Sequence, residues 1–281
     1  AVAAARLGAR TAFVGAVGND EPGRAIRAEL AAEGVDLSGL AVRPGGRSPV
    51  AYCWIEAATG QRSIAWSRGT LRPLAADEAG ESLIRGCRVL LLDGHQPEAA
   101  LQAARWARES GAAVLLDAGT YRPPMDELMA LSHVVVASEP FAGRFAPGRT
   151  PREAVSAILA RGARWAAVTL GERGAVAGDG RRWAEQPAFR VPVVDTTGAG
   201  DVYHGAVAVG LLDGAAPDDI LRFAAAAAAL KCRALGGRLG IPGRAEVEAF
   251  LKSGGEGSGK SASSRPAGRP GGCAKEGTEG I

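Results

Sequence analysis

The chain has 281 residues, 47% of them hydrophobic, and its formal net charge is only +3. This length and composition suffice for one sizeable α/β domain, and the weak charge argues against a nucleic-acid partner. The four cysteines lie far apart without a C-x-x-C pair, and no apolar run is long enough to cross a membrane. We therefore expect a cytoplasmic protein without a zinc site, a disulfide framework or membrane contact.

Strand-like apolar runs alternate with helical stretches along most of the chain. After a helix over Ala1 to Leu7, the expected strands lie near Thr11 to Val17, Val89 to Leu92, Ala113 to Asp117, Val134 to Ala137 and Trp165 to Thr169. The expected helices lie near Pro22 to Glu33, Pro97 to Ser110 and Pro151 to Arg161. This alternation predicts a three-layer α/β/α fold with a mostly parallel central sheet.

Polar residues stand where these strands end. Ligands of such folds bind beyond the carboxyl ends of the strands, because the loops gather there. The residues at or just past these ends are Asp93, Asp117, Ser138, Thr169 and Asp195. We expect a binding site among them.

Residues 42–67 follow a different pattern of short alternating runs. The runs Pro49 to Glu56 and Arg62 to Trp66 flank the turn Ala58-Thr59-Gly60, which predicts a β-hairpin. By its pattern alone, the hairpin is an ordinary sheet edge.

The segment Asp195 to Asp201, with the sequence Asp-Thr-Thr-Gly-Ala-Gly-Asp, predicts a strand end, a glycine turn and a helix start. Exposed amides at such a start form an anion site, so a phosphate can bind there. Asp201 would lie beside that phosphate, where a carboxylate can take a proton from an incoming hydroxyl. A plain helix cap is the alternative interpretation of Asp201.

This segment, with Gly205 after it, resembles the C-terminal signature of the PfkB, or ribokinase-like, carbohydrate kinases. Residues 1–23, with Gly8, Gly18 and Asp20, resemble the later part of the family's N-terminal signature. The earlier Gly-Gly part would precede residue 1, so we expect an N-terminally truncated domain without the first strand. The predicted domain covers 1–251, with lid elements at about 42–67.

The resemblance implies phosphorylation of a sugar or sugar-derivative hydroxyl by ATP, with Asp201 as general base and Gly198, Ala199 and Gly200 completing an anion hole. It places Thr169, Gly171, Gly174, Gly236 and Gly237 at the nucleotide. His95 and Asp93 would contact the sugar, whereas His133 and His204 are expected to be structural. It also implies Mg²⁺ and leaves a monovalent cation open. The family's N-x-x-E metal motif is altered here, and Glu139 is the one acid left in it.

Several phrases, among them Ser138 to Pro140 and Val193 to His204, are closest to the sulfofructose kinase branch. Trp66 and His95, however, stand where that branch has Asn and Arg. A homodimer through the lid is a further implication. The alternatives are a non-catalytic fragment and a nucleoside kinase on the same fold.

Residues 252–281 are rich in Gly, Ser and Pro and almost free of apolar residues, which predicts a disordered tail. Within it, Gly254 to Ser261 matches the P-loop pattern by its letters. A P-loop lies between a buried strand and a helix, and the sequence predicts neither at this place, so we interpret the match as chance.

Overall fold

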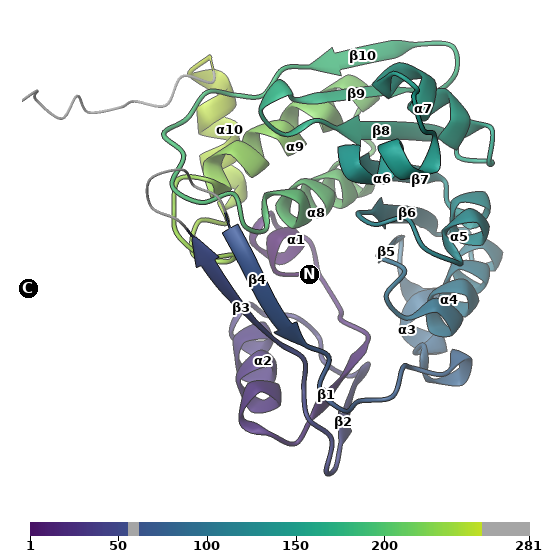
Figure 1. Ribbon diagram of the computed structural model, residues 1–281, viewed down its shortest axis with the longest axis vertical. Coiled ribbons are helices and arrows are strands. Elements are labelled where there is room, and N and C mark those ends of the chain that lie inside the picture. Colours follow the sequence, from purple (N-terminus) through teal and green to yellow (C-terminus); the bar gives the residue numbers. More distant parts are fainter. Residues whose placement is uncertain (56–61, 255–281) are drawn as a thin grey trace, which may run out of the picture.

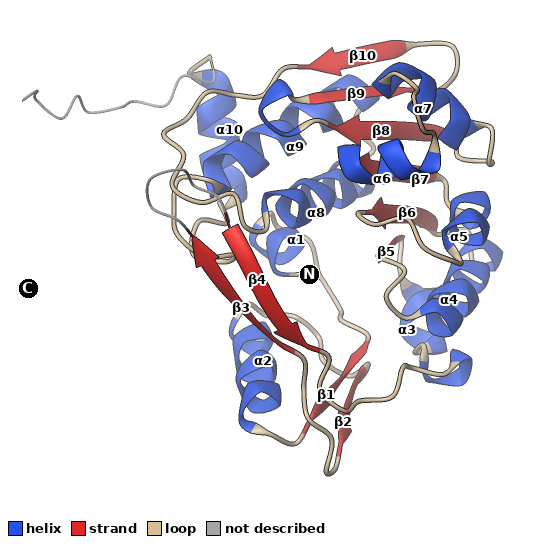
Figure 2. Ribbon diagram, in the orientation of Figure 1, coloured by secondary structure: helices blue, strands red, loops and turns tan. Residues whose placement is uncertain are grey.

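Six strands form the central sheet, in the order β10–β9–β8–β7–β6–β5 (Figures 1 and 2). The computed structural model describes residues 1–55 and 62–254. The strands are β5 (Val89–Leu92), β6 (Ala113–Ala118), β7 (Val134–Ser138), β8 (Trp165–Thr169), β9 (Ala175–Gly178) and β10 (Trp183–Gln186). Strands β5 to β8 pair in parallel, and β9 and β10 are antiparallel. The predicted, largely parallel sheet is confirmed.

Helices cover both faces of this sheet. One face packs on α4 (Pro97–Glu109), α5 (Met125–Leu131), α6 (Glu139–Phe145) and α7 (Pro151–Leu159). The other packs on α8 (Ala199–Leu212) and α9 (Pro217–Lys231), with α1 (Val2–Arg6) and α10 (Arg244–Lys252) beyond them. Neighbouring strand residues point to opposite faces, so Leu115 joins the α8–α9 core and Leu116 the α5–α7 core. This is the predicted three-layer fold.

Local signals explain where these helices begin. Ser138 ends β7 and accepts the N–H of Phe141, which caps α6. Thr150 and Glu153 form a capping box around Pro151 at the start of α7. Helix α7 ends at Leu159, two residues before the predicted end, ahead of Gly162 with φ +117°.

Helix α8 is the most deeply buried helix. Residues 202–210 are buried without interruption, because α8 lies between the sheet and α9. Such a helix has no solvent face, so an Ala/Val/Gly composition suits it. Its N-terminus opens at the carboxyl ends of the strands, and this places Asp201.

A smaller part of the chain lies beside the central sheet (Figure 1). It contains the parallel pair β1 (Gly15–Gly18) and β2 (Leu40–Arg43), helix α2 (Glu21–Ala32), and the antiparallel pair β3 (Val50–Ile55) and β4 (Arg62–Ser67). A 3-10 turn (Ala76–Glu78) and α3 (Glu81–Gly86) lead back to the sheet. The strand expected from Thr11 begins only at Gly15. Before it, the chain makes a single isolated bridge, from Ala12 to Asp36.

Within this smaller part, Asp20 joins the start of α2 to the segment before β3. Its carboxylate accepts the N–H of Gly23 at 3.0 Å, and the N–H and hydroxyl of Ser48 at 2.7 and 2.6 Å. Gly18 lies so close to this junction that a Cβ there would stand 2.1 Å from the carbonyl oxygen of Gly46. The glycine is needed for this close approach.

Two predicted features fall on residues outside the described ranges. The hairpin turn at 58–60 is one, and most of the tail, including nearly all of the P-loop-like 254–261, is the other. The end of the domain near residue 251 therefore stays a prediction, although α10 runs to Lys252. None of the described helices is both long and apolar enough to span a membrane.

Candidate active site

The glycine turn and the helix start before α8 have the predicted form, but the predicted strand before them is wrong: residues 187–196 form no strand, so Asp195 stands in a loop and not at a strand end. Gly198 caps the helix with φ +77°, and a Cβ there would lie 3.0 Å from the carbonyl oxygen of Gly237. Both the left-handed backbone and this close approach require glycine. Asp201 lies in the first turn of the helix and is exposed. The N–H of Ala199 donates to the Thr196 carbonyl oxygen at 3.1 Å, whereas the other amides at the start of the helix have no intrahelical acceptor and stand next to a carboxylate.

Hydrogen bonds of Asp195 and Lys231 hold this turn in place. The Asp195 carboxylate accepts the N–H groups of Thr197 and Gly236, each at 2.8 Å. The fully buried Lys231 donates from Nζ to the Asp195 carbonyl oxygen at 2.8 Å. Burial alone would raise the pKa of Asp195, but these donors and the Lys231 charge outweigh it and lower the pKa. Asp195 therefore stays ionised and ties the turn to the loop after α9.

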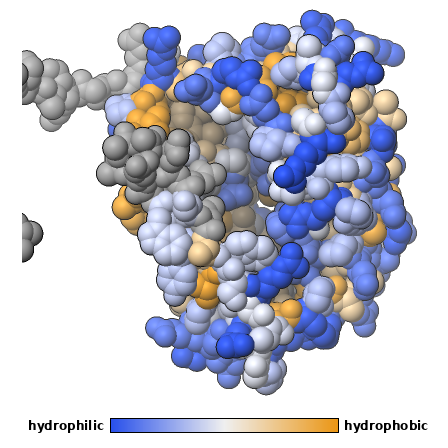
Figure 3. Space-filling view, in the orientation of Figure 1, coloured by the Kyte–Doolittle hydropathy of each residue, from blue (hydrophilic) through white to orange (hydrophobic). Residues whose placement is uncertain are grey.

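A cavity of about 280 Å³ opens in front of the turn. The surface is hollowed between the hairpin and the end of the central sheet (Figure 3). Residues from four strand ends and from α8 line this cavity, among them Asp93, His95, Asp117, Thr169, Gly200 and Asp201. The fold thus brings together side chains that are spread over more than a hundred residues of sequence, as expected for parallel strands.

His204 forms the floor of the cavity, one helical turn after Asp201. Its Nδ1 lies 2.7 Å from the Gly200 carbonyl oxygen and 3.3 Å from Oδ2 of Asp117, and its Nε2 lies 3.1 Å from the Val136 carbonyl oxygen. Both ring nitrogens thus lie within hydrogen-bonding distance of backbone oxygens, which holds the ring between α8 and β7. Burial raises the pKa of Asp117, and the charge of His204 acts in the opposite direction.

At the other end of the cavity, His95 follows β5. The Asp93 carboxylate accepts the N–H of His95 at 2.9 Å, so Asp93 folds back on its own turn. Nη1 of Arg122 lies 3.2 Å from Nδ1 of His95. No sequence pattern marks Arg122, because it stands in a loop four residues past the end of β6.

The predicted nucleotide residues divide into two groups. Thr169 lines the cavity, and Gly236 and Gly237 lie against the turn through Asp195 and Gly198. Gly171 and Gly174 lie in the loop beyond β8, outside the cavity. A Cβ at Gly174 would stand 1.9 Å from the Gln186 carbonyl oxygen, so packing against β10 already explains this glycine.

Glu139 lies away from the cavity and pairs with Arg173. Among the described residues, no group of three or more acidic, histidine or cysteine side chains could hold a metal. Mg²⁺ needs no such cage when nucleotide phosphates and water supply most ligands, with one or two carboxylates at most. The carboxylates of Asp117 and Asp201 on the cavity wall fit that requirement.

His204 and Arg122 line the cavity although the sequence predicted no role for either of them there, whereas Asp117 was one of the strand-end residues expected at a binding site. Asp117 was recognisable as a strand end, and His204 stands three residues after Asp201. His133, in contrast, accepts the N–H of Val114 at 3.0 Å, as a structural histidine would.

Comparison with known proteins connects this geometry to a family. Residues 1–244 match the model of the pfkB family carbohydrate kinases. The chain is 32% identical to a ribokinase of Bacillus subtilis over 254 residues, which are 89% of this chain and 85% of the relative.

Two solved structures show the same fold. The ribokinase of Arabidopsis thaliana, complexed with ribose and ATP, is 28% identical with a TM-score of 0.79, covering 90% of this chain and 85% of the other. The adenosine kinase of Sinorhizobium meliloti is 25% identical with a TM-score of 0.80, covering 89% and 80%. The chain belongs to the PfkB family of carbohydrate kinases, phosphotransferases that use an alcohol group as acceptor.

Proposed function

We propose that this chain transfers the γ-phosphoryl group of ATP to a sugar hydroxyl, with Asp201 as general base. The observation that carries the proposal is the exposed Asp201 carboxylate in the first turn of α8, beside the glycine turn and open to the cavity. A family match alone leaves the reacting group unnamed. This geometry puts a base and a set of amide donors within one turn of helix.

In the reaction, the sugar oxygen forms a bond to the γ-phosphorus while the bond from that phosphorus to the bridging oxygen of ADP breaks. The hydroxyl proton passes to the Asp201 carboxylate. The amides of Gly198, Gly200 and Asp201 hold the negative charge of the transferred group, whereas the N–H of Ala199 already donates to the Thr196 carbonyl oxygen. Asp117 and Asp201 would help the nucleotide phosphates to hold Mg²⁺, which would neutralise part of the phosphate charge when bound.

Thr169 and the Gly236–Gly237 loop are proposed to position the nucleotide, and His95 and Asp93 to contact the sugar. Gly171 and Gly174 shape the loop beyond Thr169, and Glu139 is left with a structural ion pair to Arg173. The proposal assigns no residue to a monovalent cation.

The β3–β4 hairpin is proposed as a lid over the sugar, since closure excludes water that would compete for the phosphoryl group. Tyr52, Trp54 and Trp66 on this hairpin are 59 to 66% exposed. Large exposed aromatic side chains favour a contact surface, so the hairpin is also the proposed homodimer contact. The molar mass in solution tests this part.

The substitution Asp201→Asn tests the base. We expect kcat to fall by roughly 10² to 10⁴-fold, with folding and ATP binding retained. Asp218→Asn is the matched control, because Asp218 is also an exposed first-turn acid, on α9. Near-normal turnover in the Asp201 variant contradicts the proposed mechanism.

A nucleoside kinase is the second candidate, favoured by the structural likeness to an adenosine kinase. Faster phosphorylation of adenosine or inosine than of any sugar would support it. No phosphoryl transfer to either class would instead support a non-catalytic relative.

A further inference from the structure

Arg122 and His95 lie together in the cavity, and Arg122 has no ion-pair partner among the described residues. The two side chains are 3.2 Å apart, from Nη1 of Arg122 to Nδ1 of His95. Within the described ranges, no carboxylate oxygen lies within 4.0 Å of the Arg122 guanidinium. An arginine that lines a cavity and has no ion-pair partner is available to a ligand.

The contact between them determines which nitrogen of the His95 ring accepts a hydrogen bond. A guanidinium can only donate, so Nδ1 of His95 accepts and the ring hydrogen stands on Nε2. Arg122 keeps further N–H groups that this contact does not use. The pair therefore offers several hydrogen-bond donors and one full positive charge to the cavity.

The three acids that line the cavity have other partners or another task. Asp117 lies 3.3 Å from Nδ1 of His204, and Asp93 accepts the N–H of His95. Asp201 lies at the start of α8, where the proposed function needs it as a base. None of these carboxylates forms an ion pair with Arg122, so its guanidinium has no direct acidic partner among the described residues.

Strand order places this pair away from the proposed nucleotide side. Thr169 ends β8, whereas His95 follows β5 and Arg122 follows β6, with β7 between. The Gly236–Gly237 loop also lies with the turn rather than with the ends of β5 and β6. An anion held by Arg122 and His95 therefore belongs to the acceptor.

We propose that the acceptor sugar carries an acid group, bound by Arg122 and His95, at the end opposite the hydroxyl that is phosphorylated. Arginine donates two parallel hydrogen bonds to carboxylate, phosphate or sulfonate oxygens, so all three acids share this chemistry. This inference rests on the proposed sugar kinase function and specifies its substrate.

The test compares neutral sugars with acidic partners that keep a free primary hydroxyl, such as glucitol with gluconate and fructose with fructose 6-phosphate. We expect at least one acid to exceed its neutral partner in kcat/KM by roughly 10 to 100-fold, the range for hydrogen bonds to charged groups. Arg122→Met should remove that preference and leave KM for ATP unchanged, and Arg122→Lys should restore part of it. Arg105→Met, at an exposed arginine of α4, is the control.

Two results overturn the inference while the kinase function stands: faster turnover of the neutral partners, or an Arg122→Met variant whose only change is a higher KM for ATP. The second result would assign Arg122 to the nucleotide phosphates. If no sugar is phosphorylated, calorimetric titration with the same pairs decides. Binding of acidic but not neutral sugars, lost in Arg122→Met, supports the acid site, and equal or absent binding rejects it.

Discussion

Asp195 is the residue whose buried charge organises the active-site turn. We predict that Asp195→Asn lowers the free energy of unfolding by about 1–3 kcal/mol and also lowers kcat/KM, because an amide NH₂ cannot accept the second N–H. Chemical denaturation and steady-state kinetics measure both effects. Asp179 accepts two backbone N–H groups in a surface turn, so Asp179→Asn is a control that should leave kcat/KM unchanged.

The same residue predicts a dependence of stability on pH. Its pKa is lowered in the folded chain, so its contribution is fully present above the unfolded value of 3.8 and is lost as pH falls through the folded value. Denaturation at a series of pH values should therefore show the Asp195→Asn variant losing less stability than the parent chain below about pH 4. Parallel curves for the two proteins would count against this role.

At the scale of elements, the contact between α1 and α8 depends on Gly205. A Cβ there would stand 2.8 Å from the Cβ of Ala3 and 3.2 Å from the backbone nitrogen of Ala4. We predict that Gly205→Ala destabilises the chain by about 1–3 kcal/mol through overpacking. Gly143→Ala, in helix α6 with open space around the new Cβ, should instead stabilise it by up to about 1 kcal/mol. Thermal melts that shift in the same direction would contradict this explanation.

Sequence patterns predicted most of the elements, and local chemistry explains why. The strands Val89 to Leu92 and Trp165 to Thr169 were predicted at their observed bounds, because each is a short apolar run between turn residues. The parallel pair β1–β2 was only half predicted. Its second strand, Leu40–Arg43, has a single buried residue and no alternation to mark it.

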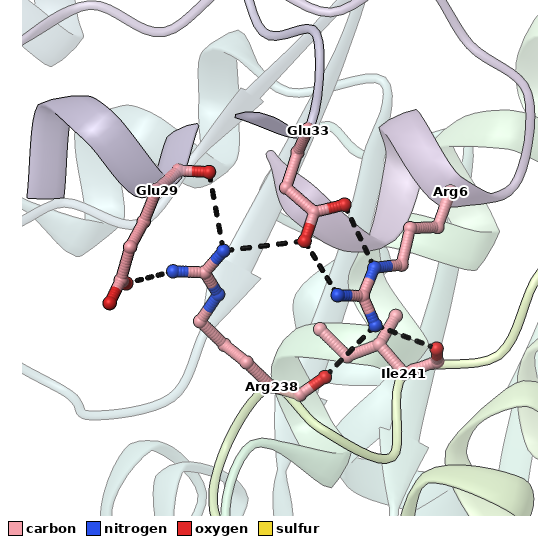
Figure 4. A network of polar contacts seen from close by, with 5 residues as sticks. All are labelled: Arg6, Glu29, Glu33, Arg238 and Ile241. Atoms are coloured by element: carbon pink, nitrogen blue, oxygen red, sulfur yellow. Dashed lines mark hydrogen bonds and ion pairs between the residues drawn. The ribbon is translucent and has the colours of Figure 1, made fainter. Parts of the chain in front are cut away.

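At the scale of the whole molecule, one ionic network joins α1 and the end of α2 to the loop after α9 (Figure 4). Glu33 at the end of α2 accepts from Arg6 at 2.5 and 2.9 Å and pairs with Arg238 at 3.3 Å. Arg6 also donates to the carbonyl oxygens of Arg238 and Ile241. Arg238 reaches Glu29 as well.

Breaking this network should change both the free energy of unfolding and the KM for ATP. The glutamate side chain is only 16% exposed, so we predict that Glu33→Gln lowers the free energy of unfolding by about 1–3 kcal/mol. KM for ATP should rise as well, because Arg238 follows Gly237 directly. Glu109→Gln removes a 60% exposed partner of Arg85 and should change neither quantity measurably. Equal losses in the two variants would show that the network has no special role.

The sequence by itself determined the α/β class, the glycine turn and the acid beside it, because periodicity, glycine spacing and a first-turn carboxylate are local properties of a chain. Only the tertiary structure decided which residues face that acid. Arg122, Asp117 and His204 come to the cavity because parallel strands end at one edge and α8 begins there, a coincidence in space that sequence distance does not record. The glycine turn predicts phosphoryl transfer, and the side chains gathered around it determine which acceptor the cavity can hold.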